Sequence, residues 1–199
     1  LLKKIGFLGP DVLAAHCIHL TNKEMRLLAT HNVKVAYNPV ANMKLGQGTA
    51  KIKDLTDLGV IVSLGTDGPA SNNTLDMFET MKVASLLQKL TYLNPTVLSA
   101  YEVLKMATIN GAKALGIDRN IGSLEVGKRA DIIFIDLSKP HLKPMHNIYA
   151  SLVYSARGSD VDTVIVDGKI LMEKHQVKTL DEKDVMEEAE KTALDLLSR

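Results

Sequence analysis

Two side chains that can handle protons or a metal ion follow short apolar runs of the sequence. Asp67 comes shortly after Val60–Leu64, and His16 comes directly after Val12–Ala15. The run before Asp67 is β-branched and nearly continuously apolar, which predicts a strand buried on both faces, and the run before His16 is likewise short and apolar. In a parallel (β/α) barrel the carboxyl ends of the strands converge on one mouth, where the chemistry takes place. We therefore expect His16 and Asp67 to face a common ligand.

Each of these residues also has a structural interpretation. An Asp-Gly pair often caps a turn, and a single histidine at a strand end is usually structural. A histidine and an aspartate at matching strand ends of one strand–helix series favour a functional role. His19, three residues after His16, is interpreted as a helix-entry or surface residue. The other histidines have no partners at metal-ligand spacing and are expected at the surface: His31, His141, His146 and His175.

Two further motifs do not support a site of their own. The segment Gly122–Lys128 matches the phosphate-loop spacing G-x-x-x-x-G-K, but Arg129 replaces the required Ser or Thr and the segment leads into a predicted strand. No helix N-terminus would then face a phosphate. Cys17 could be a thiol nucleophile only in an electropositive setting, and a buried, unreactive cysteine is the commoner case.

Composition excludes several classes of partner. The 199 residues suffice for one substantial core or two small ones, and 24 basic against 23 acidic residues leave a net charge of +1. No broad field would attract nucleic acid or an anionic membrane, and the absence of Trp argues against base stacking. No apolar run approaches the roughly 20 residues that span a bilayer. A single cysteine, Cys17, favours a reducing, cytoplasmic compartment.

Strand–helix pairs occur three times in the first half of the chain, which predicts parallel βα units. Thr21 and Glu24 have the spacing of a capping box at a helix start. Leu1–Gly6 is interpreted as the end of a helix with its C-terminal glycine. The predicted elements are a strand at 12–15, a helix at 21–30, a strand at 33–37, a loop at 40–48, a helix at 49–58, a strand at 60–67 and a helix from about 74 to 90.

The second half of the chain changes character after a helical stretch. Ser99 and Glu102 form another capping-box pattern, which predicts a helix through Met106. Strands are predicted at 131–136 and 161–172, with Asp167-Gly168 as a hairpin turn inside the second. We also predict a helical piece at 111–115 and an amphipathic helix at 181–199 with three residues packed inward: Val185, Ala189 and Leu194.

Four ordered stretches resemble the amidohydrolase superfamily, and together they extend over nearly the whole chain: residues 15–20 (AHCIHL), 38–45 (NPVANMKL), 64–73 (LGTDGPASNN) and 121–131 (IGSLEVGKRAD). The resemblance is closest to the methylthioadenosine/S-adenosylhomocysteine deaminase group, which includes 5′-deoxyadenosine deaminases. It implies hydrolytic deamination of an adenosine-type nucleoside with release of ammonia. The alternatives are another amidohydrolase, such as guanine deaminase or triazine chlorohydrolase, or a non-catalytic remnant.

The resemblance also implies roles for individual residues. Asp67 matches the aspartate at the end of the eighth barrel strand, which binds the metal, contacts the substrate and accepts a proton from the attacking water. His16 matches the sixth-strand histidine that hydrogen-bonds the attacking oxygen and the tetrahedral centre. Ser71 matches a loop residue that touches the sugar side of the substrate. Tyr37 stands where the family usually has a histidine and receives no catalytic role. The cofactor would be one divalent metal ion, zinc before iron or manganese.

The fold implied is α/β: strands six to eight of a TIM (β/α)8 barrel plus part of a small β-sandwich. Residues 1–118 would form the barrel part with a helical connector, and residues 119–199 the sandwich part with a terminal helix. The family's remaining metal ligands have no counterparts here, so we expect a missing N-terminal half before Leu1 and an inactive fragment without it. The sequence leaves open the native metal, the preferred 5′ substituent and whether the protein is a homo-oligomer.

Overall fold

The computed structural model describes residues 1–198, which divide into two compact units. The first unit contains residues 1–128 and 138–158, and the second contains residues 129–137 and the chain from 159 onward. Within the described residues, no helix is long and apolar enough to cross a membrane. The two units do not test the predicted division into domains after residue 118, which stays a prediction.

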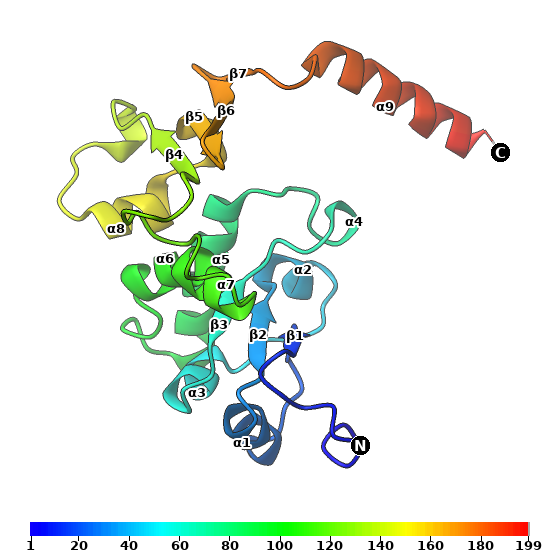
Figure 1. Ribbon diagram of the computed structural model, residues 1–199, viewed down its shortest axis with the longest axis vertical. Helices are drawn as coiled ribbons and strands as arrows, with labels where there is room; N and C mark the ends of the chain where they lie inside the picture. Colours follow the sequence, from blue (N-terminus) through cyan, green and yellow to red (C-terminus); the bar gives the residue numbers. More distant parts are fainter. Residues whose placement is uncertain (199) are drawn as a thin grey trace. The chain divides into compact units, whose positions relative to one another are not determined.

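A three-stranded parallel sheet organises the first unit (Figure 1). Its strands are β1 (Leu13–Ala15), β2 (Lys34–Tyr37) and β3 (Val62–Leu64), in the order β1-β2-β3. Buried residues lie on both β2 (Val35 and Tyr37) and β3 (Val62 and Ser63), whereas β1 has no buried residue. The predicted strands are confirmed, except that β3 ends at Leu64. Asp67 therefore lies three residues beyond its strand, in the loop that follows.

The helix between β1 and β2 begins as the sequence predicts. Helix α1 (Asn22–Thr30) is preceded by Thr21, whose backbone N–H donates to the Glu24 carboxylate at 2.8 Å. The Glu24 N–H donates in return to the Thr21 hydroxyl, which completes the capping box. This hydrogen bonding to Thr21 also lowers the pKa of Glu24.

The connection from β2 to β3 contains two short helices, α2 (Pro39–Lys44) and α3 (Ile52–Asp57). The prediction of a loop over residues 40–48 is wrong for its first half. Pro39 occupies the first helical position, where its fixed φ favours a helix and its missing N–H is not needed. An Asn-Pro pair that closes a strand can therefore also open a helix.

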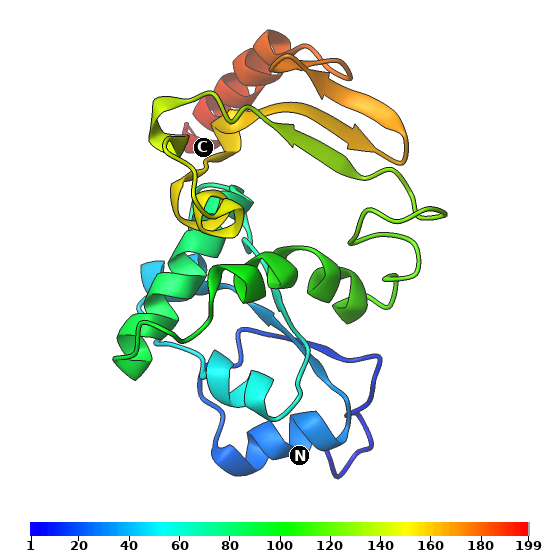
Figure 2. The ribbon, with the colours of Figure 1, turned by 90° about the vertical axis from the view of Figure 1, so that its left-hand side faces the viewer.

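Helices cover the sheet after β3. Helix α5 (Met77–Tyr92) follows the single turn α4 (Pro69–Asn72) and starts three residues later than predicted, because Asp76 caps it by accepting from Phe78 N–H at 2.7 Å. Helix α6 (Ala100–Ala107) has the predicted Ser99 capping box, and α7 (Ile109–Ala114) begins two residues before the predicted piece. Both α6 and α7 contact β3, and α6 also packs along α5 (Figure 2).

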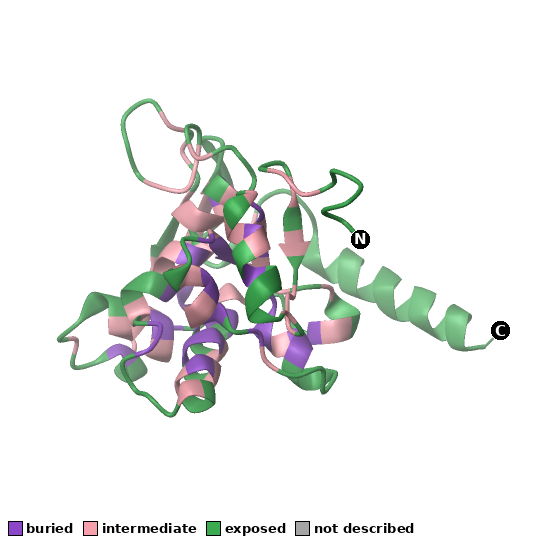
Figure 3. Ribbon diagram, turned by 90° about the horizontal axis from the view of Figure 1, so that it is seen from below, coloured by how far each residue is buried: buried purple, intermediate pink, exposed green. Residues whose placement is uncertain are grey.

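Buried residues concentrate on the strands and inward helix faces of the first unit (Figure 3). At its centre, Gln88 Nε2 donates to the Tyr37 hydroxyl at 3.1 Å and to the Ala50 carbonyl at 2.9 Å. Both Tyr37 and Gln88 are fully buried, and this burial raises the pKa of Tyr37 to about 12. Tyr37 therefore serves as a packed, hydrogen-bonded core residue.

A later segment returns to the first unit through η1 (Pro140–Leu142), α8 (Ile148–Ala150) and η2 (Ser151–Ser155). The Tyr154 hydroxyl lies 2.8 Å from the Ser85 hydroxyl on α5. The Gly158 N–H donates to Asp76 Oδ2 at 2.9 Å. The carboxylate that caps α5 thus also anchors the end of this segment.

The second unit is a four-stranded antiparallel sheet in the order β4-β5-β6-β7. Asp167 and Gly168 both have positive φ, as a tight hairpin turn between β5 and β6 requires, so the predicted hairpin is confirmed. The elements of this unit are β4 (Ile132–Ile135), β5 (Val161–Val166), β6 (Lys169–Glu173), β7 (Gln176–Val177) and α9 (Glu182–Leu197). The short helix η3 (Gly158–Asp160) begins on the last residue of the first unit and ends in the second.

Helix α9 is present as predicted, but its packing is not. Val185 is 51% exposed, Leu194 is 70% exposed, and Ala189 is exposed as well. The apolar periodicity of the sequence predicted a buried face, and this prediction is wrong for the described residues, none of which covers that face. A sequence pattern shows that a face is apolar without showing what lies against it.

Residues Leu1 to Phe7 form a turn with the hydrogen bonds of a helix C-terminus. Gly6 N–H donates to the Lys3 carbonyl at 3.2 Å, and Phe7 N–H donates to the Leu2 carbonyl at 3.1 Å. Gly6 has φ of +71°, which a residue without Cβ adopts at little cost. These bonds resemble those of a glycine-ended helix terminus, but residues 1–7 form a turn and no helix, so the predicted helix end stays a prediction.

Candidate functional site

His16 and Asp67 come together from two strands that are separated by β2. His16 Nε2 lies 3.9 Å from Asp67 Oδ2, and the two side chains are 36% and 32% exposed. At 3.9 Å the two atoms do not share a direct hydrogen bond, but one water or substrate atom can contact both. The two residues with the most versatile chemistry therefore face the same solvent-accessible space.

The backbone at both positions is held in the left-handed region. His16 has φ of +65°, Cys17 +54° and Asp67 +61°. Such a conformation costs roughly 1–3 kcal/mol for a non-glycine residue, and it concentrates at sites where a side chain must point in a required direction. His16 N–H still donates to the Ala36 carbonyl at 2.9 Å, so the chain turns immediately after its last ladder bond with β2.

The carboxylate of Asp67 is fixed by its own loop. Its Oδ1 accepts from the Gly68 N–H at 2.8 Å, which leaves Oδ2 on the side of His16. Asn72 Nδ2 donates to the Thr66 carbonyl at 2.7 Å and closes the loop across α4. One oxygen thus holds the orientation while the other is directed toward the shared space.

Two asparagines next to this pair were not singled out from the sequence. Asn42 Oδ1 lies 2.7 Å from His16 Nδ1, and Asn38 Nδ2 lies 3.5 Å from the same nitrogen. Asn38 directly precedes α2 and Asn42 lies one turn later in it, and both amides face His16 at the end of β1. A Cβ added to Gly65 would clash with Asn38 Oδ1, so a larger residue there would displace the Asn38 amide. The available signal was two asparagines spaced i, i+4 on a helix that directly follows a strand.

Ser71 lies on α4, four residues after Asp67. It is half-buried, and its hydroxyl donates to the Gly68 carbonyl at 3.0 Å. The hydroxyl oxygen can still accept a hydrogen bond from a ligand. Its contact with a substrate stays a prediction.

The thiol of Cys17 is unsuited to nucleophilic chemistry. Burial raises its pKa to about 11, so the thiol stays protonated at neutral pH. Its Sγ also contacts the Ala14 carbonyl at 3.7 Å. The sequence interpretation of an unreactive cysteine agrees with this environment.

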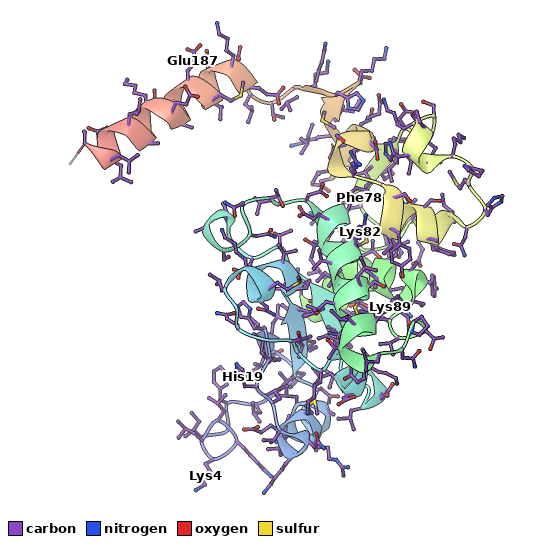
Figure 4. All side chains as sticks on the ribbon, turned by 180° about the vertical axis from the view of Figure 1, so that it is seen from behind. Lys4, His19, Phe78, Lys82, Lys89 and Glu187 are labelled. Carbon is purple, nitrogen blue, oxygen red and sulfur yellow. The ribbon has the colours of Figure 1, made fainter. Side chains whose placement is uncertain are left out.

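Four of the remaining histidines are exposed, and one is half-buried. His19, labelled in Figure 4, is exposed in the segment after β1, as are His141, His146 and His175 elsewhere. His31 is half-buried rather than at the surface, because its Nδ1 lies 2.9 Å from the Leu27 carbonyl at the end of α1.

Asp67 and His16 offer one oxygen and one nitrogen donor, the donor types that zinc, iron and manganese accept. Within residues 1–198 there is no group of three or more His, Cys, Asp or Glu side chains that could hold a metal ion. A catalytic metal site usually has about three protein ligands. These residues can therefore contribute to a metal site whose other ligands come from elsewhere.

Comparison with known proteins gives a consistent result. A family model described as the amidohydrolase family matches residues 1–171. A 5′-deoxyadenosine deaminase of Methanosarcina mazei is 55% identical over 199 residues, which are 100% of this chain and 46% of the relative. A 5-methylthioadenosine/S-adenosylhomocysteine deaminase of Moorella thermoacetica is 52% identical over 185 residues, 93% of this chain and 43% of the relative.

Among solved structures, a zinc-bound adenosine deaminase from Xanthomonas campestris superposes with a TM-score of 0.97 at 34% identity. The superposition covers 100% of this chain and 45% of that one. The chain thus spans about half the length of the curated relatives and of the solved structure that it matches.

Proposed function

The chain belongs to the amidohydrolase family, and on this premise we propose that the protein containing it is a metal-dependent deaminase of an adenosine-type nucleoside. The reaction converts the nucleoside and water into an inosine-type product and ammonia. The observation that carries the proposal is the approach of His16 Nε2 to Asp67 Oδ2 from two separate strand ends. The names of the similar proteins supply the substrate class: 5′-deoxyadenosine, methylthioadenosine or S-adenosylhomocysteine.

We propose that β1, β2 and β3 are strands six to eight of a (β/α)8 barrel and that residues 1–118 are the barrel part. The outer edges of β1 and β3 pair with no other strand among the described residues, and a barrel closes when such edges pair. An N-terminal half of the same protein would supply the remaining strands. Residues 119–199, with β4–β7, would belong to a composite β-sandwich with a terminal helix.

The metal ion would be held by Asp67 through Oδ2, together with ligands from the N-terminal half. Oδ2 is the oxygen not engaged by Gly68, and a carboxylate oxygen suits zinc, iron and manganese. When bound, a divalent cation supplies Lewis acidity and makes water more acidic. Zinc is the first choice because the similar adenosine deaminase structure contains it.

The residues of this chain would act in three ways. Asp67 Oδ2 would accept a proton from the attacking water and deliver it to the amino group, which leaves as ammonia when the C–N bond breaks. His16 Nε2 hydrogen-bonds the attacking oxygen and the tetrahedral centre that forms at the purine ring, which stabilises the transition state more than the ground state. Ser71 contacts the sugar side of the nucleoside and contributes to its orientation.

The compartment would be the cytoplasm. Cys17 is a free, protonated thiol, as is usual for a cysteine in a reducing compartment. Fractionation of cells that produce the protein, with immunodetection, would place it; recovery outside the cytoplasmic fraction would overturn this part.

The test is an ammonia-release assay of the full-length protein loaded with zinc. We expect turnover of 5′-deoxyadenosine, methylthioadenosine, S-adenosylhomocysteine or adenosine, with loss of the amine confirmed by mass spectrometry. Guanine and a chlorinated triazine serve as the competing substrates. If the protein acted on guanine or on the triazine and on none of the adenosine-type nucleosides, the proposed substrate class would be wrong. If a folded, zinc-loaded protein acted on no substrate, the protein would be a non-catalytic remnant.

A further inference from the structure

The imidazole of His16 presents its two nitrogens to different surroundings. Nε2 faces Asp67 and the accessible space, whereas Nδ1 faces α2. On that side the amide of Asn42 places Oδ1 2.7 Å from Nδ1. An amide oxygen can only accept a hydrogen bond, so this contact requires a proton on Nδ1.

Asn42 is an unusual residue for its position. Its side chain is fully buried, and its Nδ2 has no hydrogen-bond partner among the described residues. Leaving a buried amide N–H unpaired destabilises the fold, and an apolar residue of similar volume would avoid that cost. The buried amide is therefore explained by what its oxygen does, which is to accept from His16.

The competing contact to the same nitrogen is weaker. Asn38 Nδ2 lies 3.5 Å from Nδ1, at the outer limit for a hydrogen bond, against 2.7 Å for Asn42 Oδ1. If Asn38 were the partner, Nδ1 would have to be an acceptor and the proton would sit on Nε2. The shorter distance assigns the bond to Asn42.

We propose that Asn42 is a positioning residue that holds His16 as the Nδ1–H tautomer and directs the Nε2 lone pair into the space beside Asp67. As a role in catalysis, this rests on the proposed deaminase function. The neutral imidazole then accepts a hydrogen bond from the attacking water through Nε2. Donation from Nε2 to a developing negative charge requires the imidazolium form. With this tautomer, Nε2 hydrogen-bonds the attacking water as an acceptor, and it can donate to the tetrahedral centre proposed above only after it has gained a proton.

The test is the tautomer itself, read by ¹⁵N NMR of the histidine-labelled, zinc-loaded full-length protein at a pH about two units above the ordinary histidine pKa of about 6.5. His16→Gln assigns the signals of His16. His31 supplies an internal reference, because its Nδ1 lies 2.9 Å from the Leu27 carbonyl, which can only accept. We expect His16 to show the Nδ1–H pattern, as His31 does.

Two variants test whether Asn42 is the cause. Asn42→Asp keeps an acceptor in the same place, and His16 should keep the proton on Nδ1. Asn42→Leu removes the acceptor at similar volume, and His16 should lose the Nδ1–H pattern while His31 keeps it. With 5′-deoxyadenosine as substrate, Asn42→Leu should lower kcat about 10- to 100-fold with little change in KM, which Asn42→Asp should largely restore.

A purely structural Asn42 would give a different result. An Nε2–H pattern for His16 in the unmodified protein, or an unchanged Nδ1–H pattern in Asn42→Leu, would overturn the proposal. If Asn42→Leu fails to fold, as judged by the His31 signals, the tautomer of the unmodified protein and of Asn42→Asp decides. The NMR result does not depend on turnover, so an Nδ1–H tautomer in a protein without deaminase activity would refute the proposed function and leave the positioning role intact.

Discussion

Replacing Asp67 with asparagine would test the proposed catalytic role of a single atom, the carboxylate oxygen Oδ2. The new side chain would keep Oδ1 near the Gly68 N–H at the observed 2.8 Å, but an NH2 group would replace Oδ2. That atom faces His16 Nε2 at 3.9 Å and is the proposed proton acceptor and metal ligand. The backbone there has φ of +61°, and asparagine adopts this region as readily as aspartate. The fold should therefore survive the change.

The expected magnitude follows from what the carboxylate provides. General-base catalysis alone contributes about 10²- to 10⁴-fold, and loss of a metal ligand adds to this. We expect turnover by the full-length enzyme to fall at least about 10³-fold, which corresponds to about 4 kcal/mol in the activation barrier. The assay is initial-rate ammonia release, with metal content measured by elemental analysis and folding by circular dichroism.

The chain offers a matched control. Asp167 also has positive φ and is also followed by glycine, but its carboxylate lies in the exposed hairpin turn of the second unit. Asp167→Asn makes the same chemical change in similar local geometry and should leave turnover within about twofold. If Asp67→Asn kept activity within about tenfold of the unmodified enzyme, the assignment of Asp67 would be refuted.

Three other results are expected. His16→Ala should lower turnover by roughly 3–4 kcal/mol in barrier height with metal content nearly unchanged; loss of the metal would make His16 a ligand instead. Gly65→Ala should lower the free energy of unfolding by about 1–3 kcal/mol in chemical denaturation, because the new Cβ would clash with Asn38 Oδ1. The control Gly9→Ala places a Cβ with no atom within 4 Å and should have little effect. Equal stability of both variants would contradict the packing described for Gly65. Burial raises the pKa of Cys17 to about 11, so its alkylation by iodoacetamide at pH 8 should be about 100-fold slower than that of an unperturbed thiol. The alkylation rate should increase with pH up to about 11. A rate that levels off near pH 9 would show that burial does not raise the pKa of this thiol.

Local rules predicted much of the fold. The capping boxes at Thr21 and Ser99 and the hairpin at Asp167-Gly168 depend on residues close in sequence, so their patterns were sufficient. The helix at Pro39 was missed because Asn-Pro fits both the end of a strand and the start of a helix. The exposed face of α9 could not be predicted, because burial depends on a covering partner rather than on periodicity.

The candidate site also contains residues that the sequence could identify and one that only the tertiary structure reveals. His16 and Asp67 could be found from the sequence because each follows a short apolar strand, and parallel strands bring their ends to one edge. Asn42 could not be found in this way. Its role depends on one turn of α2 bringing an amide to the far side of the His16 ring, a contact between residues 26 positions apart. Only the three-dimensional structure shows that contact.

The most direct test of the central claim is a crystal structure of the full-length protein with data collected at the zinc absorption edge. The account predicts one anomalous peak about 2.0–2.2 Å from Asp67 Oδ2, with His16 Nε2 beyond ligand distance and His16 Nδ1 still on Asn42. A zinc site that does not include Asp67, or a zinc-loaded, active enzyme with no peak near that carboxylate, would contradict it.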